Sequence, residues 1–410
     1  MTAESLAIGQ RSLADPGIRY PLWPPLTTGC PKTSTDEVAY PVEVEYDYER
    51  VSASIFDAST FNAARFNAPA GGGLDRWAPL MPPLLAAGLG EGGTPLVELG
   101  GGVFVKDESR NPTWSHKDRL NRCTVSAAVG IGAEGIVVAS SGNHGASAAA
   151  YAARAGLSCV VLLSEDAPPA VASFVRAYGA AVLPVSTDAR WPLLRQLVDR
   201  LGYHPVSNLT VTHTGHAFGP EGYKSVAYEI FADVGLPAAV FVPTGYGELL
   251  FGIWKGFDEL RMLGVSTGVP RLFSCEPAAG GPLASAMARH LPAARVAVSP
   301  TAAYAIDCSV SGYRGVLALT RSSGAALALT DAELAAAQRE LASIGLWYEL
   351  SSAAGLAGYR QLGTEFDGPV VCIATSSGFK DVTVGTHDHT VIDPSWDVVC
   401  THLRNAGLPV

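Results

Sequence analysis

Between Gly135 and Ser207 the chain alternates regularly between strand and helix patterns, which few folds can accommodate. Three short apolar runs have the length of buried strands, and a segment with helical periodicity follows each of them. We expect strands at 136–139, 158–163 and 181–185, with helices at 145–155, 168–178 and 191–201. Repeated strand–helix units pack as a parallel sheet with right-handed crossovers, so the sequence predicts an α/β fold.

The same two patterns return in the C-terminal half. We expect strands at 239–242, 272–275, 347–350 and 370–374. Thr330 and Glu333 have the spacing of a capping box, which predicts the start of a helix that runs to Ser343. No regular pattern covers residues 382–410, so we expect irregular structure there.

Length and composition narrow the class of protein. A chain of 410 residues is too long for one compact core, so we expect two domains or one domain with a large insertion. The residues are 48% hydrophobic and 16% charged, and 44 of them are glycine, which suits a globular α/β enzyme. The net charge of −10 disfavours nucleic acid and anionic membranes as partners.

Two further features bear on where the protein works. No apolar run reaches the length of a membrane-spanning helix, and the polar N-terminus lacks the hydrophobic region of a signal peptide. The seven cysteines are scattered singly and form no Cys-x-x-Cys pair, which favours reduced thiols over a disulfide scaffold. We therefore expect a soluble, cytoplasmic protein.

Lys117 stands where a loop becomes a helix. The strand pattern of Val103–Val105 leads into Asn111-Pro112, which favours a turn, and apolar residues recur at helical spacing after Lys117. The positive end of a helix dipole helps to lower the pKa of such a lysine. A lysine with a lowered pKa is a nucleophilic amine that can form a Schiff base with an aldehyde cofactor; the alternative is a lysine that merely caps a surface helix.

Two other loops suit the binding of anions. Ser140-Ser141-Gly142-Asn143-His144-Gly145 follows the strand at 136–139 and opens a helix. Thr244-Gly245-Tyr246-Gly247-Glu248-Leu249 follows the strand at 239–242 and opens another. At both places, backbone N–H groups at a helix N-terminus can bind a carboxylate or a phosphate.

The Lys117 segment reads Asn-Pro-Thr-Trp-Ser-His-Lys-Asp-Arg from Asn111 to Arg119. Together with the loop at 140–145, it resembles the pyridoxal-phosphate enzymes of fold type II, and most closely threonine synthase and threonine-synthase-like enzymes. The resemblance implies two open, twisted, mostly parallel-sheet domains with helices on both faces. It implies an N-terminal extension at 1–85, a large cofactor-binding domain at 86–122 and 208–410, and a small mobile domain at 123–207 inserted into the large one.

The resemblance also implies a role for each polar residue of these loops. Lys117 would hold pyridoxal phosphate and then move protons at the substrate Cα. The expected cofactor-binding residues are His116, Asn143, Thr244, Gly245, Tyr246, Gly247, Glu248, Leu249, Thr375 and Ser376. The expected substrate-binding residues are Lys106, Thr113, Ser115, Ser140, Ser141, Gly142 and His144.

Several of these roles have alternatives. Thr375 is the first choice to face the pyridine nitrogen and Ser376 the second. His116 could contact the cofactor phosphate or simply pack as an imidazole. Lys106, Thr113 and Ser115 could serve as structural hydrogen-bond partners, as could Arg119.

Four residues depart from the family pattern: Tyr246 and Glu248 in the glycine loop, Trp114, and His116, where threonine synthases usually have phenylalanine. A Glu248 carboxylate about 4 Å from a phosphate would cost roughly 4 kcal/mol per charge pair at an effective dielectric of about 20, so we expect it to point away. Trp114 replaces a small residue of the Asn-Pro-Thr-Gly-Ser pattern, and we expect its indole to shrink or reshape the substrate pocket.

The leading hypothesis is elimination or replacement at the β or γ carbon of an activated amino acid such as O-phosphohomoserine, by a homodimer. The alternatives are a cysteate-synthase-like β-replacement, a Ser/Thr dehydratase, or a catalytically silent binding module with the same fold. We expect no metal site, since Cys30 stands alone and the pairs His213/His216 and His387/His389 lack further ligands.

Overall fold

The computed structural model describes residues 4–56, 73–165, 169–380 and 391–410. The chain divides into two compact units at Lys380. The second unit contains one helix, α12 (Trp396–Asn405), among its described residues, so the expectation of irregular structure after residue 382 was wrong there. Among the described residues, no helix combines the length and the apolar character needed to cross a bilayer. The domain boundaries expected within the first unit stay a prediction.

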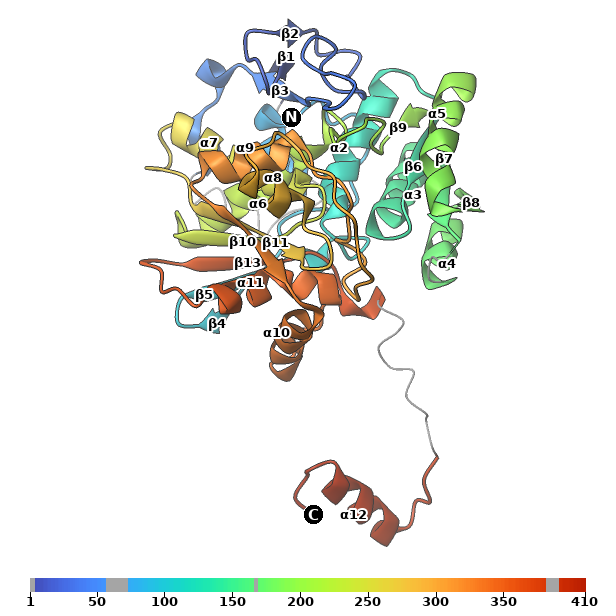
Figure 1. The fold of residues 1–410 in the computed structure, drawn as a ribbon, viewed down its shortest axis with the longest axis vertical. Coiled ribbons are helices and arrows are strands. Elements are labelled where there is room, and N and C mark those ends of the chain that lie inside the picture. Colours follow the sequence, from blue (N-terminus) through green and yellow to red (C-terminus); the bar gives the residue numbers. More distant parts are fainter. Residues whose placement is uncertain (1–3, 57–72, 166–168, 381–390) are drawn as a thin grey trace. The chain divides into compact units, whose positions relative to one another are not determined.

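A six-stranded sheet forms the centre of the first unit (Figure 1). Its strands, in spatial order, are β12 (Ala325–Leu329), β11 (Arg271–Pro277), β10 (Ala239–Pro243), β13 (Val370–Ala374), β5 (Val103–Asp107) and β4 (Leu96–Gly100). Neighbouring strands are parallel except β4, which runs antiparallel to β5. The carboxyl ends of β5, β10 and β13 therefore lie along one edge, where ligands bind in open α/β sheets.

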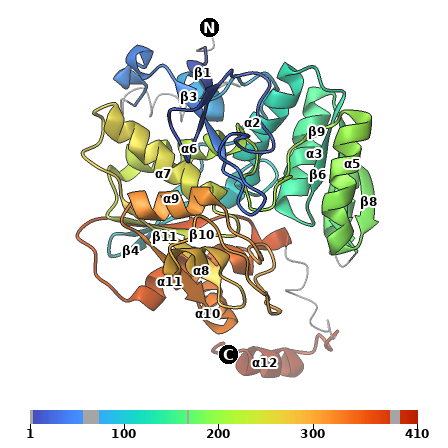
Figure 2. The same ribbon diagram turned by 45° about the horizontal axis from the view of Figure 1, so that its top comes forward.

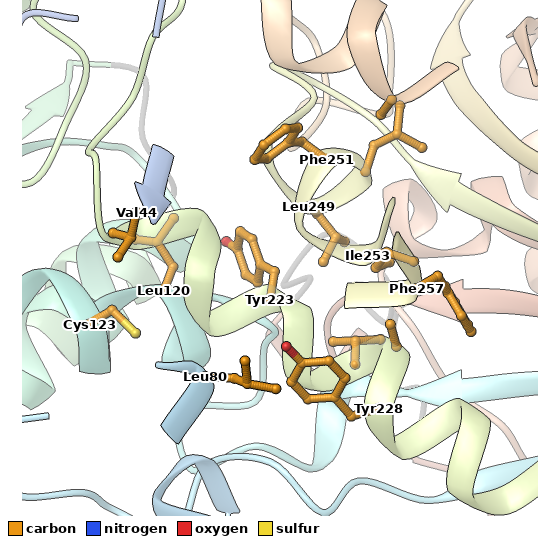
Figure 3. Close-up of a cluster of buried hydrophobic side chains, with 14 of the residues drawn as sticks. Val44, Leu80, Leu120, Cys123, Tyr223, Tyr228, Leu249, Phe251, Ile253 and Phe257 are labelled. Atoms are coloured by element: carbon orange, nitrogen blue, oxygen red, sulfur yellow. The ribbon is translucent and has the colours of Figure 1, made fainter. Parts of the chain in front are cut away.

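Alternate residues of each strand face opposite cores, as the pleat requires. Val240 and Val242 of β10 pack in the core under α6 (Gly219–Val234), α7 (Glu248–Met262) and α9 (Tyr313–Arg321). Ala239 and Phe241 pack in a second core under α10 (Asp331–Ser343) and α11 (Ala354–Leu362). Figure 3 shows part of the first core, including Leu120, Tyr223 and Leu249. The sheet is thus covered on both faces, which explains its nearly continuous apolar strands.

A second, four-stranded parallel sheet has the order β8 (Ala181–Val185), β7 (Ser158–Ser164), β6 (Gly135–Ala139) and β9 (His204–Pro205). Figure 2 shows it beside the first sheet with its helices. Those helices are α2 (Lys117–Gly130), α3 (Asn143–Ala155), α4 (Pro169–Ala177) and α5 (Arg190–Leu201). These elements confirm the strand–helix alternation and the α/β fold predicted from the sequence. A small antiparallel sheet of β2 (Arg19–Tyr20), β1 (Ala7–Ser12) and β3 (Val42–Tyr46) precedes both.

The C-terminal half contains one error of prediction and one confirmation. Residues 347–350 do not form a strand: Tyr348 makes a single bridge to Ser377, and the short 3₁₀ helix η6 (Leu350–Ala353) follows. The capping box is present, because the Thr330 hydroxyl accepts from the Glu333 N–H and the Glu333 carboxylate accepts from the Thr330 N–H.

A buried pair of histidines joins β9 to the loop before α6. The Nε2 atoms of His204 and His216 are 2.8 Å apart, and His216 Nδ1 accepts from the Phe218 N–H at 2.9 Å. Since Nδ1 of His216 is an acceptor, its Nε2 carries the proton and donates to His204. Burial lowers the pKa of His204 to about 4 and that of His216 well below its usual value.

These shifts predict acid sensitivity. The unfolded chain takes up protons on these imidazoles near pH 6.5, whereas folded His204 does so only near pH 4, so the free energy of unfolding falls as pH drops through this window. His204 alone accounts for a loss of about 3 kcal/mol by pH 4. Urea unfolding at pH 7 and pH 5 should show a smaller difference for His204→Gln than for the unchanged chain. Parallel losses in the two proteins would contradict this assignment.

Candidate active site

Lys117 is the first residue of α2, as the sequence predicts, and lies beyond the carboxyl end of β5. Its Nζ donates to the hydroxyl of Tyr223 on α6 at 3.2 Å. Burial lowers the pKa of Lys117, and Glu248 partly offsets that effect. The predicted direction of the shift is confirmed, with burial rather than the helix dipole as its main cause.

His116 lies directly before this lysine and is tied to the loop after β13. Its backbone N–H donates to the Thr375 carbonyl at 2.9 Å, and its Nδ1 lies 3.2 Å from the same oxygen. Burial and the neighbouring Lys117 keep the pKa of His116 well below its usual value, so the ring is neutral. These contacts hold the start of α2 against the β13 loop.

The loop after β6 brings Asn143 and His144 to the first turn of α3. His144 Nε2 lies 3.1 Å from the Val206 carbonyl, and burial lowers the pKa of His144 to about 4, so the ring is neutral at pH 7. The Ser140 hydroxyl accepts from the Gly142 N–H at 3.3 Å. The Ser141 hydroxyl instead accepts from the Ser164 N–H at 2.8 Å and from Arg190 at 3.2 Å.

The loop after β10 is tightly packed around two glycines. A Cβ on Gly245 would lie 2.9 Å from Cys308 Sγ, and one on Gly247 would lie 2.9 Å from the Gly315 Cα. Gly247 also has φ +88°, a conformation that suits glycine, and α7 begins at the next residue. N–H groups in the first turn of a helix have no intrahelical acceptor, so this turn offers donors to an anion. The Thr244 hydroxyl donates to the Val242 carbonyl of its own strand at 2.7 Å.

Side chains of this loop contact His213. The ring of Tyr246 stacks on His213 with centroids 4.0 Å apart, and a Glu248 carboxylate oxygen lies 3.3 Å from His213 Nε2. Burial alone would raise the pKa of Glu248. His213 outweighs this effect, and the pKa is lowered to about 2. The Glu248 carboxylate is therefore ionised and directed at an imidazole. That it turns away from a bound phosphate stays a prediction.

Thr375 and Ser376 follow β13 and are buried. The Thr375 hydroxyl lies 2.8 Å from the Ser352 hydroxyl. The Ser376 hydroxyl reaches both the Trp114 carbonyl at 3.0 Å and Asn143 Oδ1 at 3.2 Å. Ser115, which bridges to Ser376, has a fully buried hydroxyl with no hydrogen-bond partner among the described residues.

A buried ionic network surrounds Arg119 of α2. Arg119 donates to Glu108 at 2.7 and 2.8 Å and to Glu229 at 2.6 and 2.8 Å. Lys106 pairs with Glu229 at 2.7 Å and donates to the Thr94 carbonyl at 2.7 Å. The structural alternative considered for Lys106 and Arg119 accounts for all these contacts.

Asp118 ties the Lys117 segment to α3. It accepts from the Thr113 N–H at 2.6 Å, from the Thr113 hydroxyl at 2.5 Å and from the Ser147 hydroxyl at 2.6 Å. Burial raises the pKa of Asp118 to about 6. Thr113 thereby fixes the loop that leads to Lys117.

Trp114 stands at a turn in a left-handed conformation and is partly exposed. Its φ is +63°, which favours glycine, and its side chain is 48% exposed and packs edge-on against Phe174 of α4. That the indole shrinks or reshapes the substrate pocket stays a prediction. A left-handed φ favours glycine, the residue that stands at this position in the Asn-Pro-Thr-Gly-Ser pattern.

Four residues that the sequence did not single out for the site also lie here: Tyr223, His213, Glu349 and Lys380. Asn143 Nδ2 donates to the Glu349 carboxylate at 3.1 and 3.3 Å, and Lys380 Nζ donates to Asn143 Oδ1 at 2.7 Å. Tyr223, Glu349 and Lys380 lie more than 100 residues from their partners in the chain, and His213 lies 35 residues from Glu248, so no local pattern marks these contacts. Only the packing of the two sheets brings them together.

Comparison with known proteins agrees with this architecture. Residues 88–376 match the family model described as "Pyridoxal-phosphate dependent enzyme", and the chain belongs to that family. Among curated proteins, it is similar to the threonine synthase of Methanocaldococcus jannaschii, with 31% identity over 86% of this chain and 91% of that protein. It is also similar to that of Halalkalibacterium halodurans, with 33% identity over 73% and 85%. Maize serine racemase shares the fold, with a TM-score of 0.60, 18% identity and coverage of 77% and 93%.

The groups around Lys117 suit pyridoxal phosphate, the cofactor of this family. Lys117 is an amine with a lowered pKa, which favours covalent bonding to an aldehyde. The first turn of α7 offers backbone donors for a phosphate. In the loop before it, positions 245 and 247 have room only for glycine. The hydroxyls of Thr375 and Ser376 offer uncharged partners for a ring nitrogen.

Proposed function

We propose that this enzyme eliminates or replaces a leaving group at the β or γ carbon of an activated amino acid, with O-phosphohomoserine as the first substrate to test. The observation that carries the proposal is the Lys117 amine, which has a lowered pKa and lies among loops from both of the larger sheets. The similarity to threonine synthases over most of the chain supports the choice of substrate.

In the proposed reaction, bound pyridoxal phosphate supplies an electron sink for charge that develops at the substrate Cα. Lys117 takes the Cα proton and returns a proton to the substrate, which its lowered pKa permits near neutral pH. Tyr223 orients the Lys117 amine through its hydroxyl at 3.2 Å. The first turn of α3, with Asn143 and His144, binds the substrate carboxylate through backbone donors.

The proposal also assigns groups to the cofactor. The first turn of α7 binds its phosphate, and Thr375 or Ser376 faces its ring nitrogen. A neutral hydroxyl does not keep that nitrogen protonated as a carboxylate would, which favours elimination or replacement over transamination. His116 supports this site by packing, since its ring is neutral and its contacts go to the Thr375 carbonyl.

The test is the absorbance of purified protein, recorded alone and after addition of O-phosphohomoserine, O-phosphoserine, serine or threonine, with assay of released phosphate and of products. Threonine and phosphate from O-phosphohomoserine would establish γ chemistry. Turnover of O-phosphoserine or of serine and threonine instead would favour the β-replacement or dehydratase alternatives. A protein that binds the cofactor but converts none of these, with unchanged spectra, would favour the silent binding module.

The tight loop before α7 gives a prediction for cofactor binding. Gly247→Ala places a Cβ 2.9 Å from the Gly315 backbone at a residue with φ +88°, which costs about 1–2 kcal/mol. We expect pyridoxal phosphate to bind about tenfold more weakly, as measured by absorbance titration. Gly268→Ala is the matched control, because its Cβ would meet its nearest neighbour at an ordinary 3.9 Å. Equal affinities of the two variants would contradict the assignment of this loop.

We also propose that the enzyme is a cytoplasmic homodimer. The family resemblance supports the dimer, and light scattering with size-exclusion chromatography tests it by looking for twice the chain mass. All seven cysteines lie in the described part of the chain and are free thiols, which supports a reducing compartment.

A further inference from the structure

Lys380 is the last member of a series of hydrogen-bonded polar side chains in the candidate site. It is the last residue of the 3₁₀ helix η7 (Gly378–Lys380) after β13, and its Nζ donates to Asn143 Oδ1 at 2.7 Å. The Ser376 hydroxyl lies 3.2 Å from the same oxygen. On the other side of the amide, Asn143 Nδ2 donates to the Glu349 carboxylate at 3.1 and 3.3 Å. Lys380 and Glu349 belong to segments next to the first sheet, whereas Asn143 opens α3 beside the second.

The chemistry of these partners fixes the amide in one orientation. A lysine ammonium has only donors, and an ionised glutamate has only acceptors. If the Asn143 amide turned over, its nitrogen would face the Lys380 ammonium and its oxygen would face the Glu349 carboxylate. Both bonds would be lost and two like-signed contacts would replace them. Charge-assisted hydrogen bonds of this kind are roughly twice as strong as neutral ones.

We propose that Lys380 is a positioning residue of the active site, which fixes the orientation of the Asn143 amide at the start of α3 beside the bound cofactor or substrate. This inference rests on the proposed function, in which the start of α3 faces the reacting groups. It adds a residue that acts on them through Asn143 rather than by contact.

The charge of Lys380 is titratable close to neutral pH. Burial lowers its pKa to about 8, while Glu349 and Asp118 partly offset this effect. Another titratable group that Lys380 influences is His116, the residue before α2, whose pKa the ammonium helps to lower. Above pH 8 the bond to Asn143 loses its charge assistance, so the amide is held less firmly. The positioning role therefore predicts an alkaline limit near pH 8 that belongs to Lys380.

A double-mutant cycle tests this role in the full-length protein. Pyridoxal phosphate affinity is measured by absorbance titration for the unchanged chain, Lys380→Met, Asn143→Ala and the double variant, at pH 7. We expect Lys380→Met to weaken binding about tenfold when Asn143 is present and less than twofold when it is alanine. Equal losses in both backgrounds, or no loss in either, would overturn the proposal.

The conservative variant separates positioning from a general structural effect. Arginine stays charged at every pH used here, so we expect Lys380→Arg to bind the cofactor with near-normal affinity at pH 7. Above pH 8, where the unchanged chain binds more weakly, Lys380→Arg should keep its affinity. The proposal is overturned if Lys380→Arg loses cofactor affinity above pH 8 as the unchanged chain does. It is also overturned if the melting temperature of Lys380→Met falls together with its cofactor affinity, because that pattern indicates a general loss of structure. If the unchanged chain does not bind the cofactor, the proposed function fails; if it binds and the Lys380 variants bind equally, only this inference fails.

Discussion

Lys117→Ala will lower the turnover of any amino-acid substrate by at least about 10³-fold and remove the visible absorbance of the covalently held cofactor. Lys117 stands at the start of α2 with a lowered pKa and its Nζ directed at Tyr223. Alanine leaves no amine to bond the cofactor or to move the Cα proton. Single-substrate kinetics and a spectrum of the purified variant measure both effects.

Two further variants make this result specific. Lys117→Arg keeps the positive charge but not the nucleophilic amine, so we expect the same loss as with alanine. Lys32→Ala replaces an exposed lysine far along the chain and must leave the spectrum and the rate unchanged. Substantial activity in Lys117→Ala would refute the role of this residue, whereas loss of activity in Lys32→Ala would point to a damaged preparation.

The largest effect on stability is expected from Arg119→Met. Arg119 is fully buried and donates to both Glu108 and Glu229. Burial alone would raise the pKa of Glu229, but Arg119 and Lys106 hold that pKa below its usual value. Methionine fills a similar volume but leaves the two carboxylates buried with too little positive charge. Removing one partner of a buried ion pair costs about 3–5 kcal/mol. Urea unfolding should show this loss in the free energy of unfolding, or the variant should be insoluble.

Arg19→Ala provides the matched comparison. Arg19 also pairs with a carboxylate in two-point geometry, with bonds to Glu45 at 2.8 and 3.0 Å, but its side chain is 58% exposed. Water screens such a pair, so we expect a nearly unchanged midpoint of unfolding. If both variants lose the same stability, burial is not what makes the Arg119 network important.

Local sequence patterns were enough to predict much of this architecture. The strand–helix alternation gave β6, β7 and β8 with their helices, because buried parallel strands have short apolar runs and each helix has its own period. Lys117 was expected at a loop-to-helix junction, since the Asn111-Pro112 turn and the apolar spacing after it are both local signals.

The failures have a common physical origin in tertiary context. The pattern of residues 347–350 suits a strand, but only Tyr348 finds a bridging partner, so the chain turns into η6 instead. The left-handed conformation of Trp114, with φ +63°, depends on the turn around it, because a tryptophan rarely adopts it by its own preference. The Asn143 partners Glu349 and Lys380 lie more than 200 residues away in the chain, and no local period reports such a contact.

The strand order has a consequence for the newly made chain. β13 is the last strand of the six-stranded sheet to leave the ribosome, yet it lies between β10 and β5 and hydrogen-bonds to both. Until residues 370–374 emerge, two apolar strands carry unpaired edges, which is the kind of surface that aggregates. The sheet of the newly made chain therefore stays open between β10 and β5 until residues 370–374 have been translated.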